Sequence, residues 1–450
     1  MQDLLIEKTT MKKLPIAEIT LVILGSLLYF FANLQRVAIP GAVFTLLQND
    51  LNATAQSIAS LGASFMYIYA ISQLFVGIFI ARYGGFRVIT LGAILFFIGC
   101  IIFPLAHSMP VLYLSRLLTG CGSASFYLAM INETKKIVSH KNFGIALSLV
   151  LLVGYLGGIV ANAPIVICIN NLGWRKVFFI TAIATTIIAL LFVIINNFTK
   201  KPKVNTDIKI NFNLYKEVLN KKRNLNLYAF ACINYGLYYV MQTVIGKKFL
   251  EDYCSMSVIN SAVILSTMGM LYAFSGSIIA FISKITLNRR TIYLRIATLN
   301  TLFTFLCISI CIIFNVKTPV IPCILFCTIA FWASLSPLLV PLLHDINGER
   351  NSATSVSIMS CGFYIVVGLL GNFAGFCLDK LNFSNIEHSA YFIIFAVCSI
   401  IAVVACINCF KIEESAKTKR ILQYIKHHSE IEEDQNHWHD KYEHDLYNNV

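Results

Sequence analysis

The stretch "NFTKKPKVNTDIKINFNLYKEVLNKKRN", residues 197–224, is the longest polar interruption in a chain that is otherwise dominated by apolar runs. The 450 residues are 57% hydrophobic and 13% charged, with a mean hydropathy of +0.73, whereas soluble domains carry about 25% charge. Apolar runs of about 20 residues, the length that crosses a hydrocarbon core of roughly 30 Å, recur on both sides of this stretch. They leave no room for a soluble catalytic domain. The composition therefore predicts a protein that crosses a membrane many times.

Counting outward from residues 197–224 gives six predicted membrane-spanning helices on each side. The predicted spans are 16–39, 56–81, 87–107, 110–133, 143–169, 175–196, 225–248, 257–284, 291–314, 318–343, 352–378 and 388–410. The expected fold class is an all-α membrane protein with twelve transmembrane helices in two six-helix bundles. The expected domains are a cytoplasmic N-terminus (1–15), an N-terminal bundle (16–196), a central cytoplasmic loop (197–224), a C-terminal bundle (225–410) and a cytoplasmic tail (411–450).

Basic residues are distributed unevenly between the two sides of the predicted bundle. Of the 35 lysines and arginines, 27 fall on the side of the N-terminus, six fall on the opposite side, and Arg36 and Arg116 lie inside spans. Because cytoplasmic segments are enriched in lysine and arginine, this asymmetry predicts that both termini are cytoplasmic. The net charge of +13 is then explained by contact with an anionic inner leaflet, and no nucleic-acid partner is expected.

Two sequence motifs identify a family. The segment "GIFIARYGGFR", residues 77–87, resembles the loop signature of the major facilitator superfamily, Gly-x-x-x-Asp-Arg-x-Gly-Arg-Arg/Lys. The segment "RLLTGCGSAS", residues 116–125, resembles its second signature, Arg-x-x-x-Gly-x-Gly. The resemblance implies two bundles that alternate access to a central site. Ala81 stands where the loop signature has aspartate, so the carboxylate of the family's charged latch is not expected there. The residues to which the resemblance assigns a gating role are Gly77, Arg82, Gly84 and Arg87; anchoring by the positive-inside rule is the alternative for the two arginines.

Three further segments narrow the resemblance. They are "RVAIP" (36–40), "YAISQLFVGI" (69–78) and "INYGLYYVMQTVIG" (233–246). These segments resemble a bacterial subfamily that includes phagosomal transporters and takes up amino acids and nucleosides. The resemblance implies a location in the bacterial cell inner membrane and a small-molecule substrate of this kind. We expect a monomer.

A polar face runs along the first predicted span. Tyr29, Asn33, Arg36 and Pro40 recur at spacings of 4, 3 and 4 residues and therefore share one side of a helix. Snorkelling of Arg36 to the outer head groups is one alternative, but it does not explain the polar residues beneath it, so we predict that Arg36 lines a substrate cavity. Arg116, in the fourth span, is expected either in the translocation path or as a structural arginine bonded to backbone carbonyls.

Polar faces on other spans fit the same cavity. The seventh span carries a stripe of three tyrosines and a glutamine with no apolar member, although such a stripe could also be an interfacial belt. Serines in the tenth and eleventh spans, such as Ser336 and Ser360, and the neighbouring Tyr364 are attributed to helix packing. The predicted substrate-binding residues are Tyr29, Asn33, Arg36, Tyr67, Gln73, Arg116, Tyr155, Asn162, Tyr235, Tyr238, Tyr239 and Gln242.

The middle third of every predicted span lacks aspartate and glutamate. A cavity with arginines and no carboxylate is electropositive, which disfavours pumps for cationic drugs because a buried cation must be paired. It suits a carboxylate or phosphate that pairs with an arginine. The same absence argues against a carboxylate proton relay, although coupling to protons remains open. No other cofactor and no metal is expected, because the sequence has no P-loop and no metal-ligand spacing.

The sequence therefore predicts a secondary active transporter and not an enzyme. The expected cargo is a small anionic or zwitterionic metabolite, an amino acid or a short peptide in the first instance. A nucleoside or organic-anion transporter of the same fold is the alternative. A drug exporter and a multi-span membrane enzyme are less favoured, because they need buried acids or a catalytic cluster that the spans lack.

Overall fold

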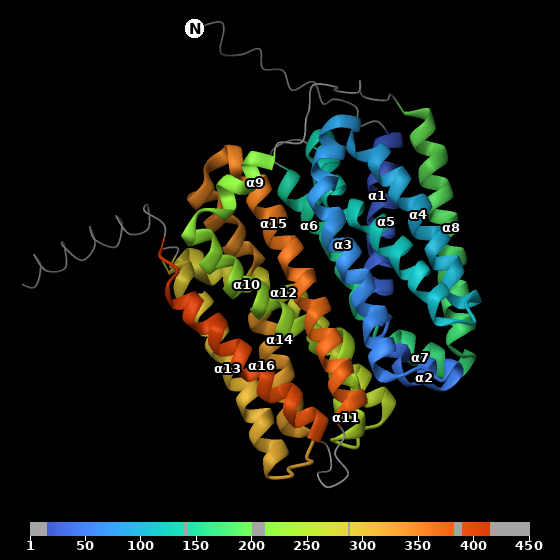
Figure 1. The fold of residues 1–450 in the computed structure, drawn as a ribbon. Helices are drawn as coiled ribbons and strands as arrows, with labels where there is room; N and C mark the ends of the chain where they lie inside the picture. Colours follow the sequence, from blue (N-terminus) through green and yellow to red (C-terminus); the bar gives the residue numbers. More distant parts are fainter. Residues whose placement is uncertain (1–15, 139–141, 200–211, 287–288, 382–388, 415–450) are drawn as a thin grey trace, which may run out of the picture.

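The structure, a computed structural model, describes residues 16–138, 142–199, 212–286, 289–381 and 389–414. Every regular element in these ranges is a helix (Figure 1). The predicted N-terminal segment (1–15), residues 200–211 of the predicted central loop and residues 415–450 of the predicted tail lie outside the described residues.

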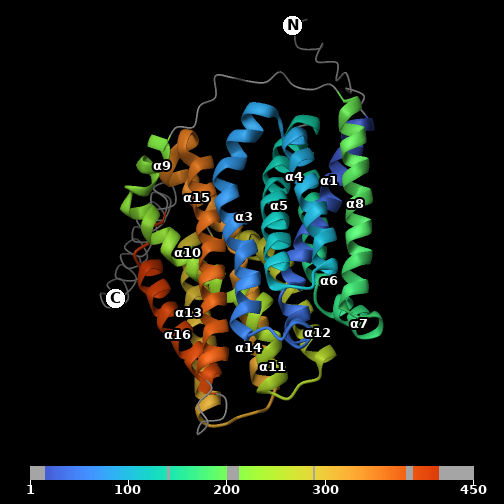
Figure 2. The same ribbon diagram turned by 45° about the vertical axis from the view of Figure 1, so that its right-hand side comes forward.

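The helices form two groups that lie side by side, the first coloured blue to green and the second green to red (Figures 1 and 2). The first group comprises α1 (Ile16–Ala38), η1 (Gly41–Val43), α2 (Phe44–Leu51), α3 (Ala55–Tyr83), α4 (Gly85–Leu105), α5 (Met109–Ile137), α6 (Phe143–Val160), α7 (Ala163–Leu172) and α8 (Trp174–Phe198). The second comprises α9 (Phe212–Leu219), α10 (Lys222–Val240), the π-helical turn η2 (Met241–Ile245), α11 (Gly246–Asp252), α12 (Val258–Ile285), α13 (Arg290–Ile313), α14 (Val320–Ala333), α15 (Ser336–Lys380) and α16 (Ser389–Phe410).

Nine helical segments of the described chain are long and apolar enough to cross a membrane, or ten if the bent pair α6–α7 is one span. The least apolar long helices, α5 and α10, are not among them. Both bury polar side chains, such as Thr119 in α5 and Asn234 in α10, which lowers their mean hydropathy. With these two helices included, the described chain has the twelve segments that the sequence predicts, and the all-α membrane fold is confirmed.

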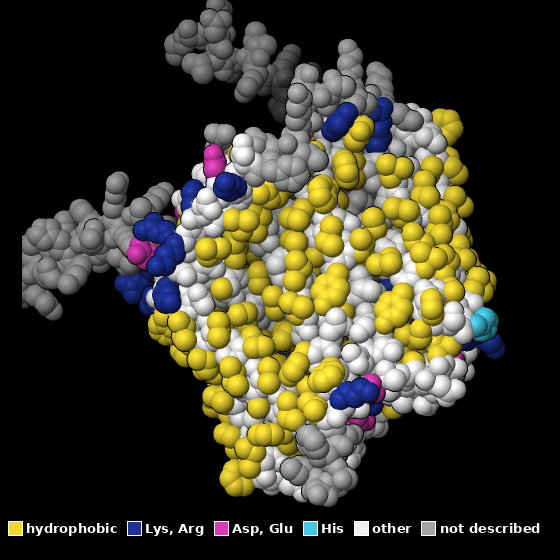
Figure 3. All heavy atoms as spheres, viewed as in Figure 1, with side chains coloured by type: hydrophobic (Ala, Val, Ile, Leu, Met, Phe, Trp, Pro, Cys, Tyr) yellow, Lys and Arg dark blue, Asp and Glu magenta, His cyan; other side chains and the backbone are white. Residues whose placement is uncertain are grey.

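Side-chain chemistry over the surface agrees with a membrane setting. Hydrophobic side chains cover the middle of the molecule, and lysine and arginine gather toward its ends (Figure 3). Large apolar residues on this belt are strongly exposed, among them Leu91 at 67% and Ile400 at 65%. An apolar surface of this extent marks contact with a membrane or with another protein, and the long apolar helices beneath it favour the membrane. We call the end that carries Arg82, Lys221 and Arg290 the basic end, and the end at which α2, α7 and α11 lie the α7 end (Figures 1 and 2).

Several predicted spans are interrupted. The fifth predicted span bends by 45° between α6 and α7, because Pro164 has no N–H for the carbonyl of Val160 and its ring crowds that carbonyl. The tenth span is split between α14 and α15. Helix α15 then continues into the eleventh span through Gly348, whose φ of +69° marks a sharp break inside it.

The central loop contains a helix that the sequence interpretation did not include. Helix α9 buries Val218 completely. The Tyr215 hydroxyl donates to the Leu74 carbonyl of α3 over 2.8 Å, and Asn351 of α15 donates to Glu217 over 3.1 Å. This short amphipathic helix was not predicted because the polar composition of residues 197–224 indicated a loop. The helix contacts both helix groups.

The predicted gating segment is a tight corner between α3 and α4. Gly77 and Arg82 belong to α3, Gly84 forms the turn with a φ of +88°, and Arg87 lies in the first turn of α4. The N–H of Gly85 donates to the Glu133 carboxylate of α5 over 2.7 Å, an anion that the helix dipole favours at the start of α4. A carboxylate is therefore present beside this corner although Ala81 lacks one, and it joins two helices of the same group.

Glycine sets the closest helix crossing between α4 and α5. A Cβ atom on Gly122 would lie 2.3 Å from the Gly92 carbonyl oxygen and 2.7 Å from the Phe96 nitrogen. These are backbone atoms, which cannot move aside as a flexible side chain could. The crossing therefore requires glycine, as in other close helix pairs of membrane proteins. Gly77, by contrast, has open space where its Cβ would be.

We expect Gly122→Ala to destabilise the protein by about 1–3 kcal/mol, the usual cost of overpacking. The measurement is the thermal unfolding midpoint of the purified protein in detergent. Gly77→Ala is the matched control, since it places the same methyl group on a helix with no neighbour within 4 Å. Equal midpoints for the two variants would contradict the packing argument.

Candidate functional site

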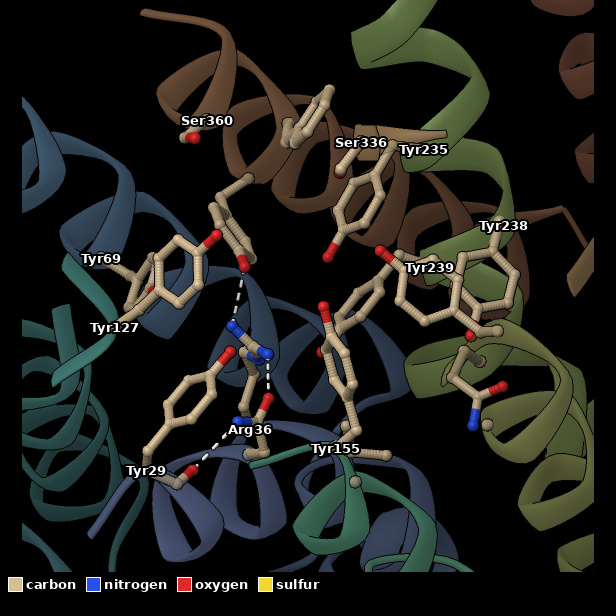
Figure 4. Close-up of a pocket in the computed structure, with 18 of the residues that line it drawn as sticks. Tyr29, Arg36, Tyr69, Tyr127, Tyr155, Tyr235, Tyr238, Tyr239, Ser336 and Ser360 are labelled. Atoms are coloured by element: carbon tan, nitrogen blue, oxygen red, sulfur yellow. Dashed lines mark hydrogen bonds between the residues drawn. The ribbon is translucent and has the colours of Figure 1, made fainter. Parts of the chain in front are cut away.

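A central cavity lies between the two helix groups (Figure 4). Its volume is about 130 Å³, below the roughly 300–1,000 Å³ of sites for drug-sized ligands. Nine tyrosines line it, contributed by α1, α3, α5, α6, α10, α12 and α15. The lining residues are Tyr29, Asn33, Arg36, Val37, Tyr69, Gln73, Tyr127, Tyr155, Gly158, Tyr235, Tyr238, Tyr239, Gln242, Gly269, Tyr272, Ser336, Ser360, Phe363 and Tyr364.

Arg36 is the one charged side chain among these lining residues. It is 7% exposed and lies in the last turn of α1, where the negative end of the helix dipole favours a cation. Its Nη1 donates to the Tyr364 hydroxyl over 2.7 Å, and its Nη2 donates to the Asn33 side-chain oxygen (Figure 4). The first of these bonds joins α1 to α15 and therefore joins the two helix groups.

Aromatic rings complete the surroundings of the Arg36 guanidinium. Its central carbon lies 5.3 Å from the ring centre of Tyr364, 5.6 Å from that of Tyr239 and 5.7 Å from that of Tyr69. Ring faces carry negative potential and attract a cation at these distances. No carboxylate lies among the residues that line the cavity, and the Nε–H of Arg36 has no partner in the part of the chain that the structure describes. The guanidinium is thus held in place with hydrogen-bonding capacity left over.

Other polar groups of the cavity are fixed by backbone bonds. Gln73 donates to the Ala124 carbonyl over 3.1 Å, and Gln242 donates to the Leu265 carbonyl over 2.8 Å. The side-chain oxygen of Gln242 is buried and has no partner in the described structure. Buried polar groups are rarely left this way, so this atom needs an explanation.

Nine of the twelve predicted binding residues line this cavity. They are Tyr29, Asn33, Arg36, Gln73, Tyr155, Tyr235, Tyr238, Tyr239 and Gln242. Arg36 does not snorkel to a membrane surface, and the tyrosine stripe of the seventh span is not an interfacial belt. Both groups are buried between the two halves.

Arg116 lies outside the cavity, and the structural alternative holds for it. It is 0% exposed. Its guanidinium donates to the Gln35 and Ile39 carbonyls, both over 3.2 Å, and lies 4.4 Å from the Phe65 ring centre. The last carbonyls of a helix have no intrahelical partner, and Pro40 offers no N–H to them. Arg116 therefore satisfies the end of α1, directly behind the turn that presents Arg36.

Tyr67 and Asn162 also lie outside the cavity lining. The Tyr67 hydroxyl accepts a hydrogen bond from Asn372 of α15 over 2.9 Å, at the contact between the two halves. Asn162 donates to the Gly158 carbonyl over 3.1 Å, at the bend between α6 and α7. Tyr67 therefore contributes to a helix–helix contact, and Asn162 satisfies a carbonyl at the end of α6.

Ten lining residues were not among the predicted binding residues, and three of these are the small or aliphatic residues Val37, Gly158 and Gly269. Ser336, Ser360 and Tyr364 were attributed to helix packing, yet they face the cavity. Tyr69 could have been found, because it lies four residues before Gln73 and shares its helix face. The remaining three, Tyr127, Tyr272 and Phe363, stand in mostly apolar surroundings that give no local signal.

The two halves are joined at the α7 end. The Ala163 N–H of α7 donates to the Ser266 hydroxyl of α12 over 2.9 Å, and this hydroxyl lies 3.2 Å from the Ile159 carbonyl. A Cβ on Gly375 of α15 would lie 2.4 Å from the Ala59 Cβ of α3, so these helices touch closely near the same end. The two halves are therefore in direct contact near this end.

The sequence profile of the Major Facilitator Superfamily matches residues 25–371. Among curated proteins, the chain is 27% identical over 162 residues to a probable anion transporter 4, chloroplastic, of Oryza sativa, covering 36% of this chain and 27% of that protein. It is 26% identical over 153 residues to an ascorbate transporter, chloroplastic, of Arabidopsis thaliana, covering 34% of this chain and 28% of that protein. The chain thus spans less than a third of the length of these two relatives.

Solved structures share the fold. One is a bacterial homolog of the human lysosomal transporter Spinster, in an inward-facing and unoccupied conformation, with a TM-score of 0.65, 17% identity, and coverage of 89% of this chain and 99% of that chain. Another is a POT family transporter in complex with 5-aminolevulinic acid, with a TM-score of 0.71, 13% identity, and coverage of 88% of this chain and 96% of that chain. At these identities the likeness concerns the fold alone.

The contrast between the two buried arginines is testable. We expect Arg116→Met to lower the unfolding midpoint and the folded yield, because two buried carbonyls lose their donors at about 1–3 kcal/mol each. Arg36→Ala should keep a midpoint near that of the wild type, since it removes a side chain from a cavity wall. The check is size-exclusion profile and thermal unfolding of both variants in one detergent. Equal loss of folding in both would show that Arg36 is structural too.

Proposed function

The chain belongs to the Major Facilitator Superfamily, and we propose that this transporter is a secondary active carrier of a small anionic or zwitterionic metabolite. It would expose the central cavity alternately to each side of the membrane as its halves rock. An amino acid, a short peptide or a small organic acid fits the proposal. The family and the relatives are transporters, and this chain is likewise a transporter and not an enzyme.

Arg36 is the single observation that carries the proposal. It is the one charged group among the residues lining the cavity, and no lining carboxylate neutralises it. The alternative of a cationic drug would place two positive charges together without a counter-ion, which is strongly unfavourable in a buried site. A carboxylate or phosphate instead supplies the missing counter-ion and can accept from the guanidinium along two parallel bonds.

Cavity size and the relatives' names support the same class. A cavity of about 130 Å³ suits a metabolite of a few heavy atoms better than a drug-sized molecule. The two relatives are named for anions in general and for ascorbate. A nucleoside, which lacks a negative charge, leaves Arg36 without a counter-ion and is the second candidate.

The contacts between the halves support alternating access. The hydrogen bonds of Ser266 and the close approach of Gly375 to Ala59 lie toward the α7 end. This end would therefore have to open for loading or release on that side. We propose that both termini are cytoplasmic, because basic residues gather on their side of the predicted bundle. We also place the protein in the bacterial inner membrane, as the resemblance to the bacterial subfamily implies. On this reading the α7 end faces outward.

Counterflow in proteoliposomes is the decisive experiment. Vesicles loaded with amino acids, short peptides, organic acids, inorganic phosphate or nucleosides are tested one class at a time against a labelled trace of the same compound. We expect exchange of a carboxylate-bearing or phosphate-bearing metabolite. Movement of cationic dyes without exchange of any anion or zwitterion would overturn the proposal.

The Arg36 variants refine the test. We expect Arg36→Ala to reduce kcat/KM for exchange by about 10- to 150-fold, the range for losing a hydrogen bond to a charged group. Arg36→Lys keeps the charge but not the planar fork, so it should retain part of the activity with a raised KM. Wild-type exchange by a correctly folded Arg36→Ala variant would remove Arg36 from substrate recognition.

A further inference from the structure

We propose that Gln242 is a second recognition point of the cavity, whose side-chain oxygen accepts a hydrogen bond from an N–H or O–H group of the substrate. This inference rests on the proposed function, since it concerns the same cargo in the same cavity. It narrows the substrate class to small organic anions that also carry a hydrogen-bond donor away from the anionic group. Amino acids, short peptides and hydroxy acids belong to this class, and inorganic anions and plain carboxylic acids do not.

The orientation of the Gln242 amide follows from its neighbour. Its nitrogen lies 2.8 Å from the Leu265 carbonyl oxygen. A backbone carbonyl can only accept a hydrogen bond, so the NH₂ group must face it and the amide oxygen must point elsewhere. That oxygen is buried, belongs to a residue that is 3% exposed, and has no partner among the described residues. A residue of the cavity lining therefore carries an unsatisfied acceptor, to which we assign a hydrogen-bond donor of the substrate.

The backbone around Gln242 departs from the regular α-helix. Gln242 lies in the π-helical turn η2, between α10 and α11. Turns of this kind occur mostly as single insertions in α-helices and often at functional sites. Gly246, the first residue of α11, would bring a Cβ atom to 2.2 Å from the Met241 carbonyl oxygen. Glycine at this position therefore permits the turn that places Gln242 on the cavity wall.

A glycine of the cavity lining lies beside Gln242. Gly158 and Gly269 both line the cavity without a side chain, and a Cβ on Gly269 would come within 3.7 Å of the Gln242 nitrogen. Tyr238 and Tyr272, stacked with ring centres 4.9 Å apart, lie on the same wall. Aromatic rings favour a nearby cation, so an ammonium group is accepted there as well as a neutral donor.

The two recognition points belong to different halves and have opposite hydrogen-bonding character. Arg36 on α1 offers donors and positive charge, whereas Gln242 on η2 offers an acceptor. Tyr239 also lines the cavity, three residues before Gln242, with its ring centre 5.6 Å from the Arg36 guanidinium carbon. A molecule with an anionic group and a separate donor can engage both halves at once, and a simple anion engages only one.

The test compares matched acids that differ only in the donor group. The probes are leucine against 4-methylpentanoate, and lactate and alanine against propionate, each as competitor in counterflow by the reconstituted full-length protein. For the pair that the protein transports, we expect the wild type to favour the donor-bearing acid by about 10-fold or more, from the usual worth of a buried hydrogen bond. Gln242→Leu should reduce this preference to about threefold or less while exchange still depends on Arg36.

Gln56→Leu is the control. Gln56 is an exposed glutamine of α3 that is not among the residues lining the cavity, so this variant should keep the wild-type preference. Equal competition by both members of the pairs in the wild type would overturn the role of Gln242, even if Gln242→Leu fails to fold. In that outcome the proposed function stands, because anions are still exchanged. Exchange of no anion or zwitterion at all would overturn the proposed function itself.

Discussion

A guanidinium buried between two helix bundles must be solvated by the protein, and here phenols and an amide perform that task in place of a carboxylate. Tyr364, Asn33 and three aromatic rings hold Arg36, and Arg116 holds the helix end from which it projects. Neutral partners stabilise the cation without cancelling its charge. A site built this way retains a positive potential, which a paired arginine would have lost.

The parts of the site that repeat with the helical period could be predicted from the sequence. The stripe formed by Tyr235, Tyr238, Tyr239 and Gln242 and the face formed by Asn33 and Arg36 all reach the cavity. Side chains at helical spacing share a face whatever the fold, so a polar stripe in an apolar helix identifies a wet or buried surface. Helical spacing alone does not distinguish a polar face that lines a cavity from one that is buried against another helix.

Arg116 illustrates that limit. Its sequence surroundings resemble those of Arg36, yet its partners are carbonyls of α1 that lie about eighty positions away in the chain. Only the tertiary arrangement shows that Pro40 ends α1 beside it. Tyr127 and Tyr272 were missed for a related reason, since an isolated tyrosine in an apolar helix reads as packing until the opposite helix is known. The helix count was predictable because span length is fixed by membrane thickness, but the bend at Pro164 and the helix α9 depend on local chemistry that the hydropathy pattern averages out.

Helix α9 joins the two halves through side chains of its own. Tyr215 bonds to the backbone of α3, and Glu217 bonds to Asn351 of α15. Helix α9 therefore does more than connect the two bundles covalently, because it forms hydrogen bonds to a helix of each bundle near the basic end. If α3 and α15 separate there, at least one of these bonds must break, at a cost of about 0.5–3 kcal/mol. The linker then contributes to the free-energy difference between the conformations open to each side of the membrane. Its sequence therefore helps to determine which of these conformations is more populated in the absence of substrate.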